Sequence, residues 1–539
     1  MQLTKQNACD VFVAGAGIAG ILAAITAAEN GKSVILASSA AIFSGSSFYP
    51  GTWGLGLVGP ENAADEEDLV QTILSVGCGM ADETMVRTFV GGITPAIARV
   101  KAMGVKLKQA QAQNQKDFIP CFDHKHRAWN GILADSARAV LKERMDALHI
   151  LQMPNCALLD ITETENRVTG VLVKTAQNTL AWLGCKALVL ATGGYGGLFE
   201  RRLTTNDVGG MGQFLAVQHG CKLVNMEFMQ MMPGCLAPCA NVIFNEKTFR
   251  YATLHDADDA DILANSSDKT ALLTQRGAHG PFTSRLDSKA VDFAITQAKG
   301  AEKQGVKVTY SEEMQRNMPE FIKTYFDWLW QQKHLTAADS VQIALFAHAA
   351  NGGVQIAPDT STPCGGLFAC GEVTGGMHGA DRIGGLSTAN GLVFGQKAGK
   401  AAAEYSASAP KNTADTTREF AVWELADAAQ IRAAMRKIMS HSAMAVRDAA
   451  SLQSAAESIA ALQKQCVRQP TADMQKAADA RLLEAQLTLA ICILKAENLR
   501  CESRGSHYRA DYPTQNTAYN QRILVQKQGE ILCIEREKQ

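Results

Sequence analysis

Hydrophobic and polar positions near the amino terminus follow one another in blocks that predict strand, helix and strand. Residues 10–15 (DVFVAG) are an apolar run, residues 15–20 (GAGIAG) are rich in glycine, and an alanine-rich stretch continues to about Gly31. Residues 33–37 (SVILA) form a second apolar run. Short apolar runs are typical of buried parallel strands, and the stretch between them is typical of a helix that crosses from one strand to the next.

The glycines of this first turn match a dinucleotide-binding motif, GxGxxG, in the setting that the motif requires. Gly15 would form the turn, Gly17 would let a pyrophosphate approach the backbone, and Gly20 would let the helix pack against the strand. The acidic residue that usually follows the second strand is absent, because Ser38 and Ser39 stand there. The motif predicts a dinucleotide, and the serines favour a larger, multiply anchored cofactor over NAD. The alternative is a glycine-rich turn in an unrelated α/β protein.

Two further apolar runs end in glycine-rich turns, far from the first in the sequence. Residues 185–197 contain one of them and residues 366–391 contain the other. Since ligands of α/β proteins bind at the carboxyl ends of strands, we expect the chain to return twice to the same ligand. Ser387 and Thr388 then precede a proline-free helical run, residues 389–405. A helix that begins at Ser387 would present its amides to an anionic or electron-rich group.

The remaining pattern divides the chain into parts. Residues 43–59 are a Ser- and Gly-rich loop, expected to contact the cofactor or, alternatively, to be a flexible surface loop. Residues 155–174 alternate like two strands joined by a turn. From about residue 233 to 336, prolines and scattered charges predict an inserted domain. Residues 412–505 have helical spacing, interrupted at Pro470, and predict a helical bundle.

Composition narrows the class of protein. The 539 residues are 47% hydrophobic and 19% charged, with a formal net charge of −1. These values predict a globular protein of several domains and argue against nucleic acid or an anionic membrane as partner. The first ten residues contain no apolar signal region and no window is long enough to span a membrane, so we expect a cytoplasmic protein.

Cysteines and histidines offer two weaker candidate sites. The 14 cysteines include no CxxC pair, although Cys235 and Cys239 flank a proline and could lie close together. Free thiols in a reducing compartment are the favoured interpretation. Asp123, His124 and His126 occur in the sequence CFDHKHR, where a strand would place both histidines on one face. Neighbouring positive charges oppose a cation there, so we predict no metal.

The three glycine-rich strand exits, together with residues 502–513 (ESRGSHYRADYP), resemble the flavoprotein family of succinate dehydrogenase, fumarate reductase and L-aspartate oxidase. Residues 378–385 (HGADRIGG) are similar to the family's HGANRLGG, with Asp381 in place of asparagine. Residues 225–234 (NMEFMQMMPG) are similar to DMEFxQFHPTG, and residues 347–354 (AHAANGGV) to AHYxxGGV. The resemblance extends over almost the whole chain in the same order.

This resemblance implies an α/β fold with an FAD-binding domain of the Rossmann-like, glutathione-reductase type, an inserted α+β capping domain and a C-terminal helical bundle. The implied FAD-binding domain has two parts, residues 1–232 and 346–408. Residues 233–345 would form the capping domain, and residues 409–539 the C-terminal helical domain and tail.

The resemblance also implies which residues contact FAD. The family's covalently linked histidine would fall in residues 43–51 (FSGSSFYPG), which contain no histidine, so we predict non-covalent FAD. The expected FAD contacts are Gly15, Ala16, Gly17, Ala19, Gly20, Ser38, Ser39, Ser44, Gly45, Ser46, Ser47, Ala157, Thr192, Gly193, Gly194, Glu372, Ser387 and Thr388.

Three residues match positions that the family uses for chemistry. Arg382 would hold a substrate carboxylate, for which a guanidinium is suited, and His348 would lie beside it. Arg285, in the implied capping domain, would donate or accept a proton. The alternatives are an ion pair of Arg285 with Asp287, an ion pair of Arg382 with Asp381, and a structural role for His348.

One departure from the family bears on the substrate. Met232 replaces the histidine of HPT, and the family's glycine-rich, glutamate-bearing segment is not recognisable between residues 236 and 280. Losing a hydrogen bond to a buried anion costs about 1.5–3 kcal/mol. Simple C4 dicarboxylates are therefore disfavoured, and the thioether of Met232 would accept an apolar or aromatic group.

The leading hypothesis is an FAD-dependent oxidoreductase that transfers hydride between flavin N5 and a carbon next to a carboxylate, by enoate reduction or the reverse. Its partners would be a small carboxylate substrate and a separate electron donor or acceptor, such as an iron–sulfur protein or a quinone-linked subunit, because the sequence has no haem motif or iron–sulfur cysteine cluster. The alternatives are an L-aspartate oxidase-like amino-acid oxidase and an electron-transfer subunit of an iron–sulfur complex with a degenerate substrate site.

Overall fold

The computed structural model describes residues 4–109, 122–123, 125, 127–410, 420, 422–529 and 531–537. Its central feature is a seven-stranded sheet in the order β6-β2-β1-β9-β8-β7, with β17 also paired with β9. The strands β1, β2, β6, β9 and β17 run parallel, whereas β7 and β8 are antiparallel additions. The bounds are β1 (Thr4–Ala14), β2 (Val34–Ala37), β6 (Leu151–Met153), β7 (Ala157–Thr164), β8 (Arg167–Lys174), β9 (Leu180–Leu190) and β17 (Leu367–Ala369).

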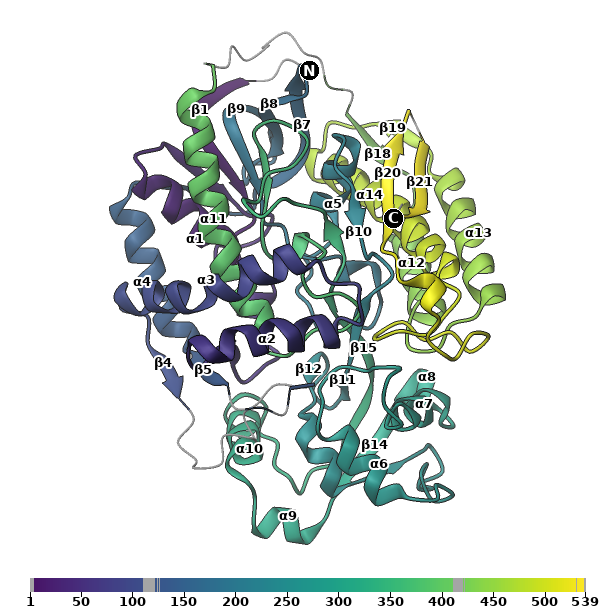
Figure 1. The fold of residues 1–539 in the computed structure, drawn as a ribbon. Coiled ribbons are helices and arrows are strands. Elements are labelled where there is room, and N and C mark those ends of the chain that lie inside the picture. Colours follow the sequence, from purple (N-terminus) through teal and green to yellow (C-terminus); the bar gives the residue numbers. More distant parts are fainter. Residues whose placement is uncertain are drawn as a thin grey trace.

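The parallel part of this sheet confirms the predicted strand–helix–strand unit. Helix α1 (Ile18–Glu29) connects β1 to β2 and packs against the long helix α11 (Leu386–Ser408). Glycines allow this close packing: a Cβ on Gly395 would lie 2.5 Å from the carbonyl oxygen of Ala19, and one on Gly399 would lie 2.3 Å from that of Ala23. Helix α11 therefore lies against the first turn of the sheet (Figure 1).

The helix after the third strand exit begins slightly earlier than predicted. Leu386 is its first residue and Gly385, with φ of 79°, precedes it, so Ser387 lies in the first turn instead of capping the helix. Only glycine adopts that backbone conformation without strain. The first amides of α11 consequently have no side-chain cap.

A second sheet organises the middle of the chain. Its five strands have the order β12-β11-β15-β14-β13, and β11 and β15 form a long antiparallel pair. A hydrophobic core separate from that of the main sheet lies between this sheet and helices α6–α10, shown at the bottom of Figure 1. This separate core supports an inserted domain. The bounds are β11 (Met229–Ala237), β12 (Val242–Ile243), β13 (Ala252–His255), β14 (Val306–Tyr310), β15 (Val341–Ala350), α6 (Lys269–Arg276), α7 (Lys289–Gln297), α8 (Ala301–Gln304), α9 (Glu312–Arg316) and α10 (Glu320–Lys333).

The carboxyl-terminal part is helical, as predicted, and Pro470 ends a short strand between two of its helices. The chain then returns through β20 and β21 into a sheet with the order β16-β10-β20-β21 (Figure 1). Within the described part of the chain, no helix has the length and apolar character needed to cross a membrane. The bounds are α12 (Ala428–Ser442), α13 (Ala449–Gln465), α14 (Met474–Leu499), β18 (Trp423–Leu425), β19 (Arg468–Pro470), β10 (Leu223–Val224), β16 (Gly353–Val354), β20 (Ile523–Gln528) and β21 (Ile531–Arg536).

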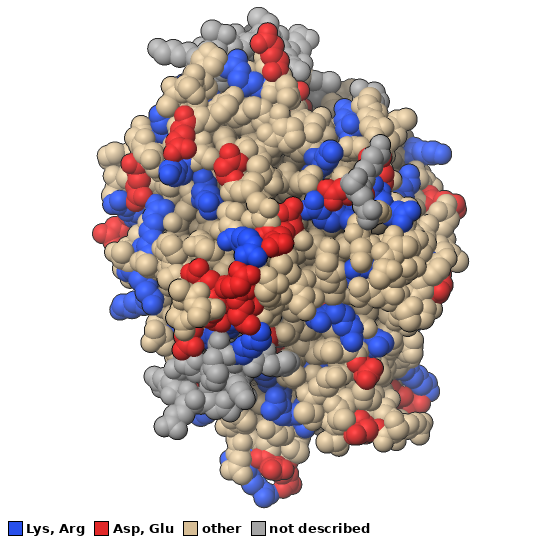
Figure 2. Space-filling model, in the orientation of Figure 1, with Lys and Arg blue, Asp and Glu red and all other residues tan. Residues whose placement is uncertain are grey.

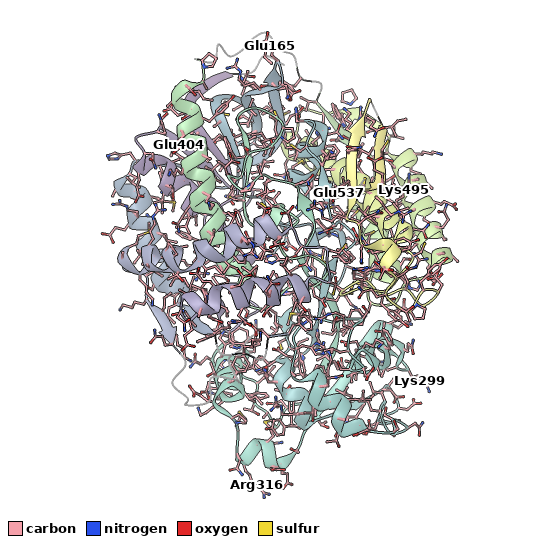
Figure 3. The ribbon with its side chains drawn as sticks, in the orientation of Figure 1. Glu165, Lys299, Arg316, Glu404, Lys495 and Glu537 are labelled. Carbon is pink, nitrogen blue, oxygen red and sulfur yellow. The ribbon has the colours of Figure 1, made fainter. Side chains whose placement is uncertain are left out.

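Charged side chains lie mainly on the outside. Figure 2 shows both signs mixed over one face, and Figure 3 shows six charged residues pointing outward at the edge of the molecule. The Asp123 carboxylate accepts a hydrogen bond from Arg127, whereas His124 and His126 lie outside the described residues. Among the described residues, no cluster of His, Cys, Asp or Glu is arranged to hold a metal ion. The other elements are β3 (Leu55–Gly59), β4 (Leu107–Gln109), β5 (Ala128–Ile132), α2 (Ala63–Val76), α3 (Glu83–Ala102), α4 (Ala134–Ala147) and α5 (Met211–Gln218).

Candidate functional site

A cavity of about 660 Å³ lies at the carboxyl ends of β1, β9 and β17. Its size suits a large ligand, because small-molecule sites usually span about 300–1,000 Å³. All three glycine-rich strand exits contribute to the wall, as the sequence predicts. The predicted cofactor residues in this wall are Gly15, Ala16, Gly17, Ala19, Ser38, Ser39, Ser44, Gly45, Ser46, Ser47, Ala157, Thr192, Gly193, Glu372, Ser387 and Thr388.

Two of the predicted cofactor residues lie behind the wall. A Cβ on Gly20 would lie 1.9 Å from the carbonyl oxygen of Gly15, so Gly20 serves the packing of helix on strand. A Cβ on Gly194 would lie 2.7 Å from Glu372 Oε1, which separates it from the cavity. Contrary to the prediction, these two glycines therefore do not line the cavity. Their backbone conformations support the residues that do form the wall.

Two helices begin at the cavity with no side-chain cap. Gly17 precedes α1 and Gly385 precedes α11, and both glycines line the cavity. The first-turn amides of a helix lack intrahelical partners and carry the positive end of the helix dipole. In α1 the amide of Ile18 donates to Ser47 Oγ at 3.3 Å. Phosphate or another electron-rich group is stabilised at such helix starts.

Small hydroxyl groups form the middle of the wall. Ser44 Oγ donates to Asp207 Oδ2 at 2.9 Å, and Ser38 Oγ lies 3.3 Å from Ser44 Oγ. The buried hydroxyls of Ser46 and Thr192 have no hydrogen-bond partner among the described residues. Since buried polar atoms are nearly always paired, these two hydroxyls indicate a polar ligand. An FAD molecule, with its pyrophosphate and ribityl hydroxyls, fits this donor set.

Glu372 closes the cavity beside the third strand exit. Its Oε1 accepts the backbone amide of Ala350 at 2.9 Å, and burial raises the pKa of the carboxyl. The strand β15, which carries His348, is thereby connected to the exit of β17. This bond sets the position of the chemistry relative to the cofactor.

Helix α14 covers the other end of the cavity, which the sequence did not predict. Gln475, Ala478, Asp479 and Leu482 line the wall from this C-terminal helix. Lys174 Nζ donates to Gln475 Oε1 at 2.6 Å and thus connects the sheet to the helix. Asp207 was also missed. No local motif identifies either contribution, because both depend on how distant segments pack.

The predicted substrate residues Met232, His348 and Arg382 all line the cavity. Arg382 is 7% exposed. Its Nε donates to Gln230 Oε1 at 2.9 Å and its Nη1 to Ser387 Oγ at 3.2 Å. Burial, reinforced by Arg382, lowers the pKa of His348 to about 3. The imidazole of His348 is therefore neutral near pH 7 and can donate one hydrogen bond to an anion.

The walls around these residues are largely apolar. A buried cluster of Leu203, Met232, Ile243 and Phe346 lies against them, with Tyr49 and Trp53 packed at its edge. One carboxylate, that of Glu246, also lines this region of the cavity. The further apolar residues of the wall here are Tyr49, Trp53, Leu203, Ile243 and Pro281.

Arg285 does not line the cavity, although Gly280 and Pro281 of the same loop do. Arg285 Nε donates to Asp381 Oδ2 at 2.9 Å, and the Thr283 hydroxyl donates to the same oxygen at 2.7 Å. Burial lowers the pKa of Arg285, but the Asp381 carboxylate offsets this effect and the pKa is raised overall. Burial raises the pKa of Asp381 to about 6, against the opposing effect of Arg285.

These contacts answer the alternatives for the two acids. Asp381 binds Arg285 of the inserted segment, where its neighbour Arg382 had been the alternative partner. Asp287 lies 4.0 Å from Lys289 and is 93% exposed. The acid that replaces asparagine in HGADRIGG thus joins the cavity loop to the inserted segment.

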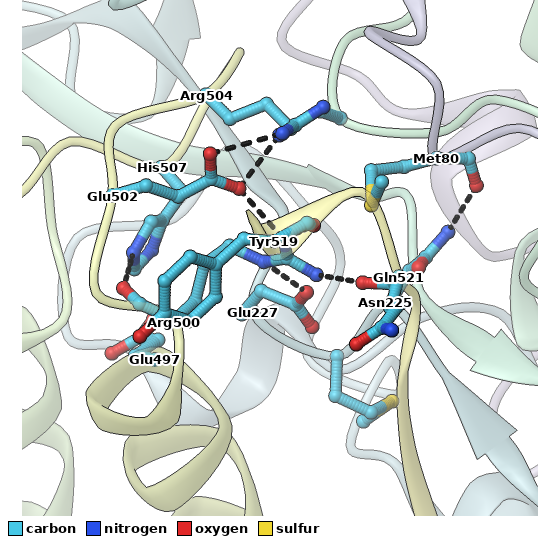
Figure 4. Close-up of polar contacts among 12 residues, drawn as sticks. Met80, Asn225, Glu227, Glu497, Arg500, Glu502, Arg504, His507, Tyr519 and Gln521 are labelled. Atoms are coloured by element: carbon cyan, nitrogen blue, oxygen red, sulfur yellow. Dashed lines mark hydrogen bonds and ion pairs between the residues drawn. The ribbon is translucent and has the colours of Figure 1, made fainter. Parts of the chain in front are cut away.

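The most recognisable C-terminal motif lies outside the cavity and forms the buried charge cluster: Glu227, Arg447, Glu497, Arg500, Glu502, Arg504 and His507. Arg500 binds Glu227 and Glu502 at 2.8 Å each, and Arg504 binds Glu502 at 2.7 Å (Figure 4). Every member is at most 1% exposed. The neighbouring Gly505 carbonyl accepts the amide of Ser284 at 2.7 Å, so this segment also supports the loop that carries Arg285.

The sequence matches two family models. Residues 10–388 match the FAD binding domain, and residues 432–537 match the fumarate reductase flavoprotein C-term. A subunit of the fumarate reductase (CoM/CoB) of Methanothermobacter marburgensis is 25% identical over 555 residues, covering 97% of this chain and 98% of that protein. L-aspartate oxidase of Mycobacterium tuberculosis is 26% identical over 525 residues, covering 94% of this chain and 93% of that protein.

Solved structures share the fold. The Sdh1 complex of Mycobacterium smegmatis contains a chain that superposes with a TM-score of 0.81 at 21% identity, covering 99% of this chain and 94% of that chain. A quinol–fumarate reductase with menaquinol molecules gives a TM-score of 0.80 at 20% identity, covering 99% of this chain and 98% of that chain. These likenesses confirm the predicted α/β fold with its helical C-terminal part.

Proposed function

Since the chain belongs to the flavoprotein family of succinate dehydrogenase, fumarate reductase and L-aspartate oxidase, and is an FAD-dependent oxidoreductase, we propose that it acts on a carboxylate with an apolar or aromatic substituent. The reaction would move hydride between FAD and a carbon next to the carboxylate, by enoate reduction or the reverse. A simple C4 dicarboxylate is disfavoured as substrate.

The observation that carries this proposal is the composition of the cavity near Arg382. Arg382 and neutral His348 lie at one side of a wall that is otherwise built from Met232 and aromatic or aliphatic neighbours. A guanidinium with an adjacent imidazole suits one carboxylate. The opposite wall favours burial of an apolar group, at about 25 cal/mol per Å² of apolar surface.

The residues of the chain have separate roles in this mechanism. When bound, FAD supplies the hydride donor or acceptor. Arg382 and His348 hold the carboxylate, and their hydrogen bonds stabilise the negative charge that develops on it as the adjacent carbon reacts. Met232, Trp53 and their neighbours exclude water from the reacting carbon. The first turn of α11 stabilises negative charge near Ser387.

The proton is proposed to pass through Arg285. Because Arg285 faces Asp381 in this conformation, the loop at residues 280–285 must turn it toward the cavity for reaction. Asp381 is the buried acid of this pair, and the burial that raises its pKa to about 6 keeps its proton available near neutral pH. Arginine alone rarely gives up a proton, so a carboxyl partner makes the transfer more reasonable.

FAD is proposed to bind without a covalent bond, because residues 43–51 contain no histidine. A separate protein is proposed to supply or accept electrons. Support comes from the solved structures named as an Sdh1 complex and a quinol–fumarate reductase, whose chains share this fold.

A second candidate is an amino-acid oxidase, favoured by the presence of Glu246 in the same cavity as Arg382. A carboxylate and a guanidinium together suit the ammonium and carboxylate of an amino acid. The L-aspartate oxidase relatives support this candidate. Peroxide formation with L-amino acids in air would favour it over the first.

The decisive experiment uses the FAD-loaded protein without oxygen. The flavin is reduced chemically, and aromatic and aliphatic enoates are added while the visible absorbance of the flavin is followed. Reoxidation by an enoate with an apolar substituent, faster than by fumarate, is the expected result. If neither enoates nor the saturated acids change the redox state of the flavin, the chain is instead an electron-transfer subunit with a degenerate site, and the proposal fails.

A further inference from the structure

Cys235 and Cys239 form a pair that the proposed reaction does not use. Cys235 lies in β11 and Cys239 in the connection to β12, and the two side chains are hydrogen-bonded to each other. The Tyr325 side chain is also hydrogen-bonded to Cys235. Cys235 is fully buried, whereas Cys239 is 7% exposed and is flanked by exposed Pro238 and Ala240.

The two thiols differ in the way that a reactive pair requires. The hydrogen bond from Cys235, helped by the Lys333 ammonium, lowers the pKa of Cys239 to about 7, while the pKa of Cys235 is raised. A thiolate is the nucleophilic form of cysteine, and positive charge nearby favours it. Cys239 therefore carries the attacking sulfur and Cys235 a protonated sulfur beside it.

Access to the pair comes from the surface. Ala240, Asn241, Val242 and Lys333 line a hollow of about 460 Å³ next to Cys239. A small oxidant that enters this hollow needs only a shift of the exposed turn to reach the sulfur. Redox-sensitive cysteines are typically low in pKa, near the surface and next to a second cysteine.

We propose that Cys235 and Cys239 form a reversible dithiol–disulfide site for hydrogen peroxide or another small peroxide. The Cys239 thiolate attacks one peroxide oxygen, the O–O bond breaks, and a sulfenic acid and water form after one proton is taken up. The Cys235 sulfur then attacks the sulfenic sulfur, and its proton leaves with the hydroxyl as a second water. The two thiols lose two electrons and the peroxide gains them.

The chain contains a matched control pair. Cys9 and Cys185 face each other across β1 and β9, and Cys9 has the same 7% exposure as Cys239. Burial raises the pKa of Cys9 to about 12 and that of Cys185 well above its usual value. Proximity and exposure alone would make the two pairs react alike, whereas thiolate character would separate them.

The test treats the full-length, FAD-loaded and fully reduced protein with hydrogen peroxide and follows intact mass and peptide maps. We expect a loss of about 2 Da, mapped to Cys235 and Cys239 and reversed by dithiothreitol. Its rate should rise with pH up to about pH 7 and level off, and should exceed oxidation at Cys9 by at least about 100-fold. These outcomes do not depend on the substrate or on flavin chemistry.

Two variants define the roles. Cys235→Ser should leave a sulfenic acid on Cys239 that dimedone captures, and Cys239→Ser should leave Cys235 unmodified. Equal oxidation of Cys9 and Cys185, or a wild-type protein in which Cys239 proceeds to sulfinic acid without a disulfide, would overturn the proposal. Because the peptide map of the wild type decides the matter, a variant that fails to fold does not leave it open.

Discussion

Arginine serves two different purposes in two regions of this molecule. In the buried charge cluster, Arg500 and Arg504 contact the carboxylates of Glu227 and Glu502 at 2.7–2.8 Å, away from any cavity. At the cavity, Arg382 lines a space that can hold a ligand and lies beside a neutral histidine. The more recognisable motif thus forms the interior structure, and the less regular segment forms the site.

The two regions also differ in what a lost side chain would leave behind. Removing one member of a buried ion pair leaves the other charge desolvated and uncompensated. Removing Arg382 opens the cavity further, where water can hydrate its former neighbours. We therefore expect mutations in the cluster to change stability, and mutations at Arg382 to change ligand binding.

The largest effect is expected for Arg500→Met. The change leaves Glu227 and Glu502, both fully buried, without their shared cation. Breaking a buried pair in this way costs about 3–5 kcal/mol of folding stability. Urea unfolding followed by far-UV circular dichroism measures it. Arg536→Met, at the C-terminal edge strand, is the surface control and should change stability by less than about 0.5 kcal/mol. Equal stabilities of the two variants would contradict the assigned role of the cluster.

The next effect is expected for Arg382→Met. It should weaken the binding of an aromatic carboxylate by about 100-fold, because the charge-assisted hydrogen bonds are lost. Folding stability should fall by only about 1 kcal/mol, since Gln230 loses one partner. Binding is measured by perturbation of the flavin absorbance, and stability by urea unfolding. Arg382→Lys keeps the charge but not the planar fork, and should have intermediate affinity. Unchanged affinity in the Met variant would remove Arg382 from the site.

The third effect concerns pH and the cluster alone. Burial raises the pKa of Glu497 to about 8, above its value in an unfolded chain. The folded protein therefore holds a proton there that the unfolded chain has already lost, and stability falls as pH rises from about 4.5 to 8. Glu497→Gln should reduce this loss between pH 6 and pH 8 by about 1–2 kcal/mol. Urea unfolding at both pH values tests it. A wild-type protein as stable at pH 8 as at pH 6 would argue against a protonated Glu497.

The same contrast explains what the sequence could reveal. The three strand exits were predictable because glycine and short apolar runs carry local information, and α11 begins within two residues of the predicted start. The pairing of Arg285 with Asp381 was not predictable, because it joins residues 96 positions apart through the packing of a separate segment. Asp207 and Gln475 entered the wall for the same reason. Local patterns identify a cofactor turn, but a substrate pocket is assembled from distant segments.

The smallest effect is expected at Met232, where the cavity departs from the family pattern. Met232→His introduces a hydrogen-bond donor into the apolar wall opposite Arg382. A dicarboxylate should gain several-fold in affinity, about 1 kcal/mol, because one hydrogen bond to its second carboxylate is restored. An aromatic monocarboxylate should lose a similar amount, because the imidazole is poorly solvated beside it. Met232→Leu conserves volume and should leave both affinities within about threefold. Competition between the two ligands, followed by flavin absorbance, separates these outcomes. If Met232→His weakens both ligands equally, the residue fills space without selecting the substrate, and the preference for an apolar substituent must come from Trp53 and its neighbours.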